Sequence, residues 1–399
     1  MHSPYFTVIV PTRNRAELLP DALQSVLLQD FLDFELIISD NFNDERTEAA
    51  ISPFRADKRV RVIRTPSVLP MTEHWQFAAE KAKGQFILFV TDRSVLKKGA
   101  LSTIFRAIQD CKSEVDLCSW TWTLYNDQGG YEYGESLLVD PAVPAQLMSS
   151  SDVARGFTKS PGRFAYILPR GLNSCFSRPL FERFMSVHGS PFQPVSPDYF
   201  SAFLLLGFTN HMLHIPQPLF VSQGLAISNG GNGYLGTSEK YLATLGDIDW
   251  MRHVPIKAPF VDNTIFADFL AAKEKIGGSL ATVELDWPTY YYACFLELVA
   301  KKGARVLHPG RLNEFNSAWE KALSQESVEI QKLTKKMVNT QPFATQLAYL
   351  RYSKPGATLR KLKHWITRFR AGTSNAPKST VLEVAGFDAD TCRQWTVSK

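Results

Sequence analysis

The feature that most constrains the fold of this chain is an apolar strand pattern that occurs three times and each time ends abruptly in polar residues. The strands are expected at residues 6–10, 34–39 and 85–91, and the polar residues that follow them are 11–14, 40–41 and 92–94. Continuous apolar strands separated by helical patterns are typical of a parallel sheet covered on both faces. Because ligands of such sheets bind beyond the carboxyl ends of the strands, we expect the three ends to form one site.

Apolar periodicity predicts how the rest of the chain is organised. A helix is expected over residues 18–27, another over 75–84 with Gly84 as its left-handed cap, and a short strand over 59–64. A further strand is expected over 115–125 and a helix over 198–206. Beyond about residue 236 helical patterns dominate, at 265–275, 290–302, 312–323 and 328–338. The sequence therefore predicts an α/β domain followed by a mostly helical C-terminal extension.

Composition places the chain among ordinary globular proteins. Its 399 residues are 45% apolar and 21% charged, enough to bury a large core. The five cysteines are an odd number without any Cys-x-x-Cys pair, which argues against a disulfide framework or a zinc cluster. No secretory signal pattern and no apolar run of about 18 residues is visible. We therefore expect a cytoplasmic protein.

Four segments carry a resemblance to a known family. They read TVIVPTRNR at residues 7–15, SVLLQD at 25–30, ELIISDN at 35–41 and KGQFILFV at 83–90. In this order and spacing they resemble the family 2 glycosyltransferases, strongly over residues 5–102 and weakly as far as 233. The resemblance implies a GT-A fold, a Rossmann-like sheet with helices on both faces, and sugar transfer with inversion. We accordingly expect a GT-A domain at 1–235, a helical extension at 236–349, a basic amphipathic segment at 350–378 and a tail at 379–399.

The resemblance implies roles for the first two strand ends. The nucleotide pocket would be lined by Pro11, Thr12, Arg13 and Asn14. Asp40, with Asn41 beside it, falls where the family binds the base, often uracil. A carboxylate suits this task, because it accepts from a ring N–H that would cost about 1–3 kcal/mol if buried unpaired. Asp40 also suits a helix N-cap or a turn, and both interpretations are open.

The third strand end departs from the family pattern. The family usually has an Asp-x-Asp motif there, whose carboxylates hold Mg²⁺ or Mn²⁺ against the donor diphosphate, whereas this chain reads Asp92, Arg93, Ser94. Three interpretations are open: Asp92 holds a weakly bound ion with the diphosphate and waters, Arg93 itself neutralises the diphosphate, or transfer has been lost and a binding shell remains. His214 is a further candidate metal ligand, although a lone histidine on an apolar strand is more often structural.

The expected catalytic base is Asp198. It lies in the stretch Ser-Pro-Asp-Tyr-Phe at residues 196–200, about a hundred residues after Asp92, where the family places a carboxylate at a helix start. This group would take the proton from the acceptor hydroxyl. The alternative is an ordinary first-turn acid favoured by the helix dipole. Trp120, Trp122 and Tyr125 are either core residues or a stacking surface for an acceptor sugar.

Basic charge concentrates near the C-terminus. Residues 350–378 hold eight Lys and Arg residues and no Asp or Glu. On a helix the cations would occupy one side, and the other would carry Leu359, Leu362, Trp365, Ile366 and Phe369. This pattern is typical of a helix lying on an anionic membrane surface, which we expect at 357–371; the alternative is a helix docked on the body of the protein. Nucleic acid is not an expected partner, because the aromatic residues lie opposite the cations.

These patterns together predict an inverting transferase in cell-surface polysaccharide synthesis, cytoplasmic or peripheral on the inner face of the membrane. Its expected donor is a nucleotide-sugar with UDP as the nucleotide, and its acceptor is a hydroxyl of a glycan or a lipid-linked saccharide. A Mg²⁺ or Mn²⁺ cofactor is one of the open alternatives at Asp92. The alternative function is a non-catalytic binding or scaffold protein that retains the fold.

Overall fold

The computed structural model describes residues 3–41, 45–126, 131–133, 143–193, 196–223, 249–305, 307–351 and 380–388. Some predictions lie outside these residues. They are the membrane-binding segment at 357–371, the rest of the basic segment from residue 352, and the domain boundary near residue 235.

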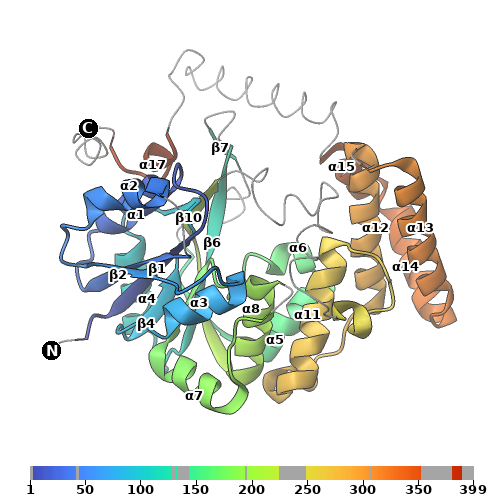
Figure 1. Ribbon diagram of the computed structural model, residues 1–399. Coiled ribbons are helices and arrows are strands. Elements are labelled where there is room, and N and C mark those ends of the chain that lie inside the picture. Colours follow the sequence, from blue (N-terminus) through green and yellow to red (C-terminus); the bar gives the residue numbers. More distant parts are fainter. Residues whose placement is uncertain are drawn as a thin grey trace.

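Residues 6–223 contain a ten-stranded sheet. In Figure 1 the helices of the later part of the chain, coloured yellow to orange, lie to the right of this sheet. Its strands are β1 (Phe6–Thr12), β2 (Phe34–Asp40), β3 (Val60–Arg64), β4 (Phe86–Phe89), β5 (Ser94–Leu96), β6 (Leu117–Asn126), β7 (Tyr131–Tyr133), β8 (Gln146–Ser149), β9 (Ser174–Ser177) and β10 (His211–Gln223). The order is β3-β2-β1-β4-β9-β6-β10-β5, with β7 paired to β6 and β8 paired to β10.

The sheet is mixed, so the expectation of a parallel sheet is wrong beyond β4. Strands β1 to β4 are parallel to one another, and β10 is parallel to β6, but β9 runs antiparallel to both β4 and β6. An apolar run shows burial and carries no information on strand direction, which is why the sequence missed this reversal. As a result, the carboxyl ends of β1, β2, β4, β6 and β10 share one edge with the amino end of β9.

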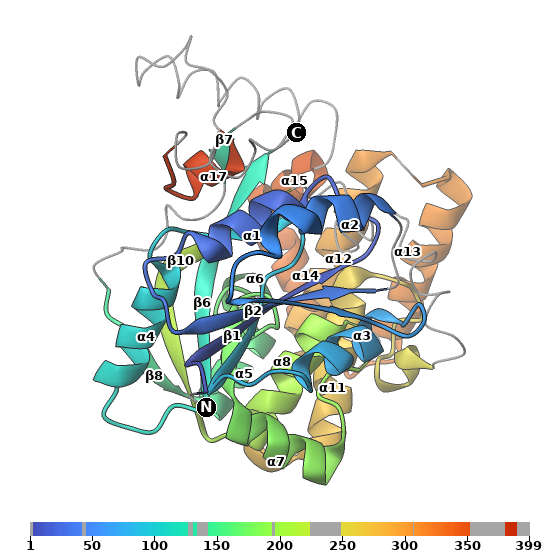
Figure 2. The same ribbon diagram turned by 60° about the vertical axis from the view of Figure 1, so that its left-hand side comes forward.

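Helices cover both faces of the sheet, as predicted. The first face is covered by α1 (Leu19–Leu27), α2 (Glu45–Ile51) with η1 (Ser52–Phe54), and α4 (Ala100–Asp110), and the second by α3 (Met71–Ala79), α5 (Ser150–Lys159), α7 (Arg178–His188) and α8 (Pro197–Phe208). Figure 2 shows α1 and α2 on one side of the strands and α3 and α8 on the other. Val8 and Val10 pack under the first set and Ile9 under the second, which explains why β1 is apolar throughout.

The helical C-terminal extension is confirmed. It contains η4 (Trp250–His253), α11 (Val261–Ile276), η5 (Gly278–Leu280), α12 (Trp287–Ala304), α13 (Pro309–Ser324), α14 (Val328–Thr340) and α15 (Pro342–Arg351). Its core is continuous with that under α8, and the buried Glu297 carboxylate of α12 caps α11 by accepting from the backbone N–H groups of Val261 and Asp262 at 2.9 Å each. Within the described residues, no helix combines the length and apolarity that crossing a bilayer requires.

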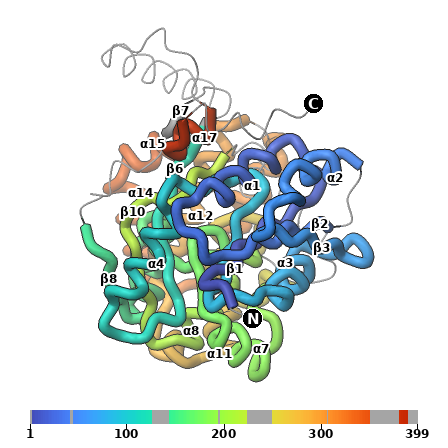
Figure 3. The backbone as a smooth tube through the Cα atoms, turned by 90° about the vertical axis from the view of Figure 1, so that its left-hand side faces the viewer, coloured from blue at the N-terminus to red at the C-terminus, as the bar shows by residue number. Residues whose placement is uncertain are grey.

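The short helix α17 (Val381–Val384) returns to the sheet (Figure 3). Val381 and Leu382 are buried against Val95 of β5 and Val221 of β10. Lys98 N–H donates to the carbonyl of Ala385 at 2.8 Å. Part of the predicted C-terminal tail is therefore fastened to the sheet.

Gly84 has a different role from the predicted helix cap. The helix α3 ends at Ala79, and Gly84 does not have a positive φ. A Cβ at this position would lie 2.4 Å from the backbone nitrogen of Thr7, and the Gly84 N–H donates to the Thr7 hydroxyl at 2.8 Å. Glycine is therefore required by the close approach of this segment to β1.

Candidate active site

Three predicted strand ends meet at one edge of the sheet. In the parallel register of β1 and β2, Thr12 lies opposite Asp40, and β4 flanks β1 on its other side. The Thr12 hydroxyl donates to Oδ2 of Asp92, which follows β4, at 3.2 Å. Thr12 thus links the second and third strand ends, and the predicted convergence is confirmed.

Asp40 is buried at the end of β2, with its side chain 1% exposed. Its Oδ2 accepts from Nε of Arg64 at 2.8 Å and lies 2.7 Å from Nη2 of the same residue. Arg64 is the partner of Asp40 in the β2–β3 register and is half exposed. The carboxylate is therefore oriented by a cation from the neighbouring strand, at the edge where we expect a base.

Asn41 uses its amide within the protein. Its Nδ2 donates to the carbonyl of Leu69 at 2.8 Å, and its Oδ1 accepts from the Thr65 hydroxyl at 3.1 Å and the Leu69 N–H at 2.9 Å. These bonds fasten the segment between β3 and α3 to the end of β2. The structure therefore gives the Asn41 side chain a positioning role beside Asp40.

Residues 11–14 carry the chain from β1 into the loop before α1. Pro11 and Thr12 are buried strand residues, whereas Arg13 and Asn14 are exposed. Asn14 has a φ of 57°, in the left-handed region that Asn tolerates better than most residues. The next residue, Arg15, turns back onto the end of β4.

Arg15 was not predicted as a site residue, yet it holds Asp92. Its Nη1 donates to Oδ1 of Asp92 at 3.1 Å, so both carboxylate oxygens of Asp92 are bonded, one to Arg15 and one to Thr12. The Asp92 side chain is 5% exposed and that of Arg15 is 31% exposed. Burial raises the pKa of Asp92, while the charge of Arg15 opposes the rise. The only sequence signal was the turn-forming Asn14 before a cation.

Arg93 fastens the segment after β4 to the end of β10. Its Nη1 donates to the Ser222 hydroxyl at 3.0 Å and to the carbonyl of Gln223 at 2.7 Å. The pKa of Arg93 is lowered to about 10. Burial is the main cause, and the positive charge of Arg15 is the second. The guanidinium is a cation at neutral pH and lies within electrostatic range of Arg15 and Asp92.

The chain topology brings Asp198 to the same edge. The helix α8 runs directly into β10, whose amino end lies at the far edge, so the first turn of α8, which contains Asp198, lies at the near edge. Asp198 and Arg170 form an ion pair of 3.8 Å, and both charges act on Arg93. The structure therefore gathers Asp198, Arg93 and Asp92 in one electrostatic cluster.

Arg170 was also missed by the sequence interpretation. Its Cζ lies 4.3 Å from the ring centre of Trp122 and 4.8 Å from that of Tyr199, the residue after Asp198. Trp122 also stacks on Tyr166 at 4.3 Å. These cation–π contacts tie the start of α8 to β6 and position Asp198. No sequence spacing relates residue 170 to 122 and 199.

The three aromatic residues proposed as an acceptor surface are separated in the structure. Trp120 is 1% exposed and belongs to the core. Trp122 contacts Arg170 and Tyr166, and Tyr125 packs against the cluster under α17. In the described part of the chain, Trp122 contacts Arg170, which pairs with Asp198.

The structure does not bring His214 together with Asp92. Its Nδ1 lies 2.9 Å from the Ser119 hydroxyl, inside the sheet, and burial lowers its pKa to about 4. His214 is near the amino end of β10. The β6 partners of His214 and Ser222 are Ser119 and Leu124, so the two β10 residues are separated by about five strand positions, roughly 16 Å. We therefore leave His214 out of the site.

The side chains around Asp92 do not fit a divalent cation held by the protein. In the described part of the chain, no group of three or more His, Cys, Asp or Glu side chains is arranged to hold a metal. Asp92 is one carboxylate with both oxygens bonded, and the cations Arg15 and Arg93 act on it. Mg²⁺ and Mn²⁺ prefer oxygen ligands and are repelled by guanidinium groups.

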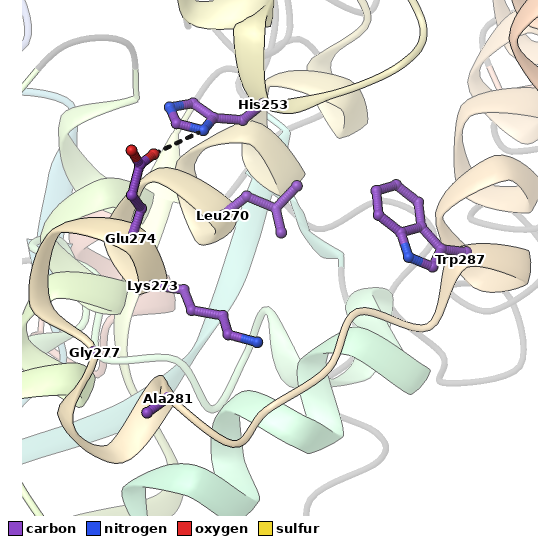
Figure 4. A pocket seen from close by; sticks show the side chains of 7 residues that line it. All are labelled: His253, Leu270, Lys273, Glu274, Gly277, Ala281 and Trp287. Carbon is purple, nitrogen blue, oxygen red and sulfur yellow. Dashed lines mark ion pairs between the residues drawn. The ribbon is translucent and has the colours of Figure 1, made fainter.

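A separate hollow lies in the helical extension (Figure 4). It has a volume of about 490 Å³ and is lined by His253, Leu270, Lys273, Glu274, Gly277, Ala281 and Trp287. His253 and Glu274 form an ion pair of 3.3 Å on one side, with Trp287 on the opposite side. The strand ends contribute none of its lining residues, so we assign it no part in the site.

The chain matches a known family over its first third. Residues 7–138 match the model of the family described as Glycosyl transferase family 2. The matched residues include β1, β2 and β4 with their polar ends. This match confirms the resemblance that four sequence segments carried.

Individual relatives are more distant. The chain is 32% identical over 105 residues to the GalNAc(5)-diNAcBac-PP-undecaprenol beta-1,3-glucosyltransferase of Campylobacter jejuni, covering 26% of this chain and 34% of that protein. It is 29% identical over 114 residues to the poly(ribitol-phosphate) beta-N-acetylglucosaminyltransferase TarS of Staphylococcus aureus, covering 28% of this chain and 20% of TarS. The chain thus spans about a third and a fifth of the length of these relatives.

A solved structure of TarS residues 1–349 from S. aureus, in complex with UDP-GlcNAc, is also similar to the chain. The two share 16% identity with a TM-score of 0.47 over 95% of this chain and 90% of that one.

Proposed function

We propose, on the premise that residues 7–138 are a family 2 glycosyltransferase domain, that the chain transfers a sugar from a nucleoside-diphosphate donor to a hydroxyl group of a glycan or lipid-linked saccharide. UDP is the nucleotide we propose, and surface polysaccharide synthesis is the setting. Two relatives support this, since their names describe enzymes that act on an undecaprenol-linked saccharide and on poly(ribitol-phosphate).

The nucleoside is proposed to bind at the ends of β1 and β2. Asp40 would accept from the ring N–H of the base, and its orientation by Arg64 supports this role because a fixed carboxylate loses less freedom on binding. Pro11 and Thr12 would form the floor of the pocket, while Arg13 and Asn14 are exposed beside it.

Asp198 is proposed as the general base. As the acceptor oxygen forms its bond to the anomeric carbon, Asp198 takes the hydroxyl proton, and the bond from that carbon to the diphosphate oxygen breaks on the opposite face. This displacement inverts the anomeric configuration and releases the nucleoside diphosphate. Asp198 is 23% exposed, so an acceptor can reach it, and Arg170 lies beside it.

The observation that carries the proposal is the meeting of Asp40, Asp92 and Asp198 at one sheet edge, reached from three separate parts of the chain. Calorimetric titration with UDP, with and without Mn²⁺, tests the donor assignment. We expect binding, and its absence under both conditions would exclude a UDP donor.

A non-catalytic binding protein is the second candidate. The observation that favours it is that Asp92, the surviving acid of the metal motif, is bonded by Arg15 and Thr12. Hydrolysis of UDP-sugars by the purified protein separates the two functions. Hydrolysis that Asp198→Asn abolishes supports the transferase, whereas UDP binding without turnover of any donor supports the binding protein.

We also propose the domain organisation and membrane contact expected from the sequence: a GT-A domain to residue 235, a helical extension to 349, and a basic segment whose residues 357–371 bind anionic lipid.

Deleting everything after residue 350 is a poor test of membrane binding, because it also removes α17 from its place on β5 and β10. Charge reversal of Lys361 and Lys363 to Glu in the full chain avoids this. We expect weaker flotation with phosphatidylserine vesicles, and unchanged flotation would contradict the membrane contact.

A further inference from the structure

We propose that Arg15 and Arg93 bind the diphosphate of the donor where the family resemblance implies a divalent cation. This inference rests on the proposed function, since it concerns the same nucleotide. It adds Arg15, a residue outside the predicted site, and it states the chemistry by which the site neutralises a leaving diphosphate.

The state of Asp92 is the first support. A carboxylate that holds a metal must present an oxygen lone pair to the ion, but Oδ1 of Asp92 accepts from Arg15 and Oδ2 from Thr12. The Asp92 side chain is almost fully buried, so these hydrogen bonds replace those that the carboxylate would make to water. Each oxygen therefore has a lone pair engaged by a donor, and the guanidinium bonded to Oδ1 would repel an ion approaching this carboxylate.

The local charge is the second support. The charges of Arg15, Asp92, Asp198 and Arg170 act on Arg93. Together with Arg93 itself, this makes three guanidinium groups and two carboxylates. Among these described groups the guanidinium groups outnumber the carboxylates, which favours a diphosphate and disfavours a divalent cation.

Geometry is the third support. Arg15 follows Thr12 at the end of β1 and keeps about a third of its side chain exposed, so it can reach a ligand in the site. Arg93 uses Nη1 for both of its bonds to β10, and those bonds do not involve Nε or Nη2. The planar guanidinium fork matches pairs of phosphate oxygens. Arg15 and Arg93, both near Asp92, can therefore contact the two phosphates.

Calorimetry with UDP and uridine tests the inference on the full-length protein. In EDTA we expect UDP to bind with a dissociation constant within threefold of its value in Mn²⁺. In Arg15→Met and Arg93→Met we expect UDP affinity to fall at least tenfold while uridine affinity stays the same, because uridine lacks phosphates. Thermal unfolding identifies any variant that fails to fold, and Arg155→Met, an exposed arginine of α5, is the matched control with no expected change.

Each outcome has a separate meaning. UDP binding that requires Mn²⁺ would overturn the inference, and so would unchanged UDP affinity in a folded Arg15→Met protein, while uridine binding in either case would leave the nucleoside site standing. If neither UDP nor uridine binds under any condition, the proposed function itself fails.

Discussion

Asp40 and Asp92 are acids at the same edge of the same sheet, but their partners reach them in different ways. Arg64 comes to Asp40 along the neighbouring strand β3, at the opposing position of the register. Arg15 reaches Asp92 from the loop after β1, in which Asn14 has a left-handed backbone conformation. The first pair follows from strand register, and the second depends on one loop conformation.

This difference has a functional consequence. Around Asp40 the described partners keep one carboxylate at the edge where a base is expected, which agrees with the family resemblance. Around Asp92 we propose that Arg15 and Arg93 replace a metal site with an anion site. On this proposal the end of β2 has the role that the family resemblance implies, and the end of β4 has a different one.

The largest expected effect is at Asp198. Asp198→Asn removes the proposed base, and we expect the rate constant of donor turnover to fall about 10²- to 10⁴-fold with unchanged UDP affinity. Asp152→Asn, which alters an exposed first-turn acid of α5, is the matched control for a helix-dipole effect and should retain full turnover. Equal rates in Asp198→Asn and the wild type would remove Asp198 from the mechanism.

Low pH should destabilise the protein through the buried side chain of His74. Its Nε2 lies 2.8 Å from the Ser39 hydroxyl beside Asp40, and burial lowers its pKa to about 4, below the unfolded value of 6.5. The unfolded state therefore binds the proton first, so stability is present above pH 6.5 and is lost as the pH falls towards 4. The loss attributable to His74 is up to about 3 kcal/mol. Urea unfolding across this range should show a shallower pH dependence in His74→Gln, and an unchanged slope would contradict this role.

A substitution at Asp40, where we propose that the nucleoside binds, should change the affinities for uridine and UDP equally. Asp40→Ala removes the proposed base contact, and we expect both ligands to lose affinity by the same factor, equivalent to about 1–3 kcal/mol. Calorimetry on both ligands measures the factor. A loss confined to UDP would place Asp40 beside the phosphates and break the contrast between the two ends.

The smallest expected effect is at Asp92. Asp92→Asn removes a negative charge beside the proposed diphosphate position, so we expect UDP affinity in EDTA to change by less than about threefold, equivalent to less than about 0.7 kcal/mol. A metal site would respond in the opposite way, with UDP affinity lost and no rescue by Mn²⁺. This variant therefore separates the two chemistries at one residue.

The parts of the site that the sequence predicted are those that depend on strands and helix starts. Thr12, Asp40 and Asp92 were found because polar residues follow apolar strands, and the helix at Asp198 because Pro197 favours a first turn. Arg15 was missed because its position depends on the φ of Asn14, and Arg170 because three distant segments bring it to Trp122 and Tyr199. Loop conformation and long-range packing are not encoded in local periodicity.

The most direct test is a crystal structure of the protein with UDP bound in the presence of EDTA. We predict the base beside Asp40 and the diphosphate in contact with Arg15 and Arg93. A nucleotide bound elsewhere, such as in the hollow beside Trp287, or a diphosphate turned away from both arginines, would contradict the proposed site.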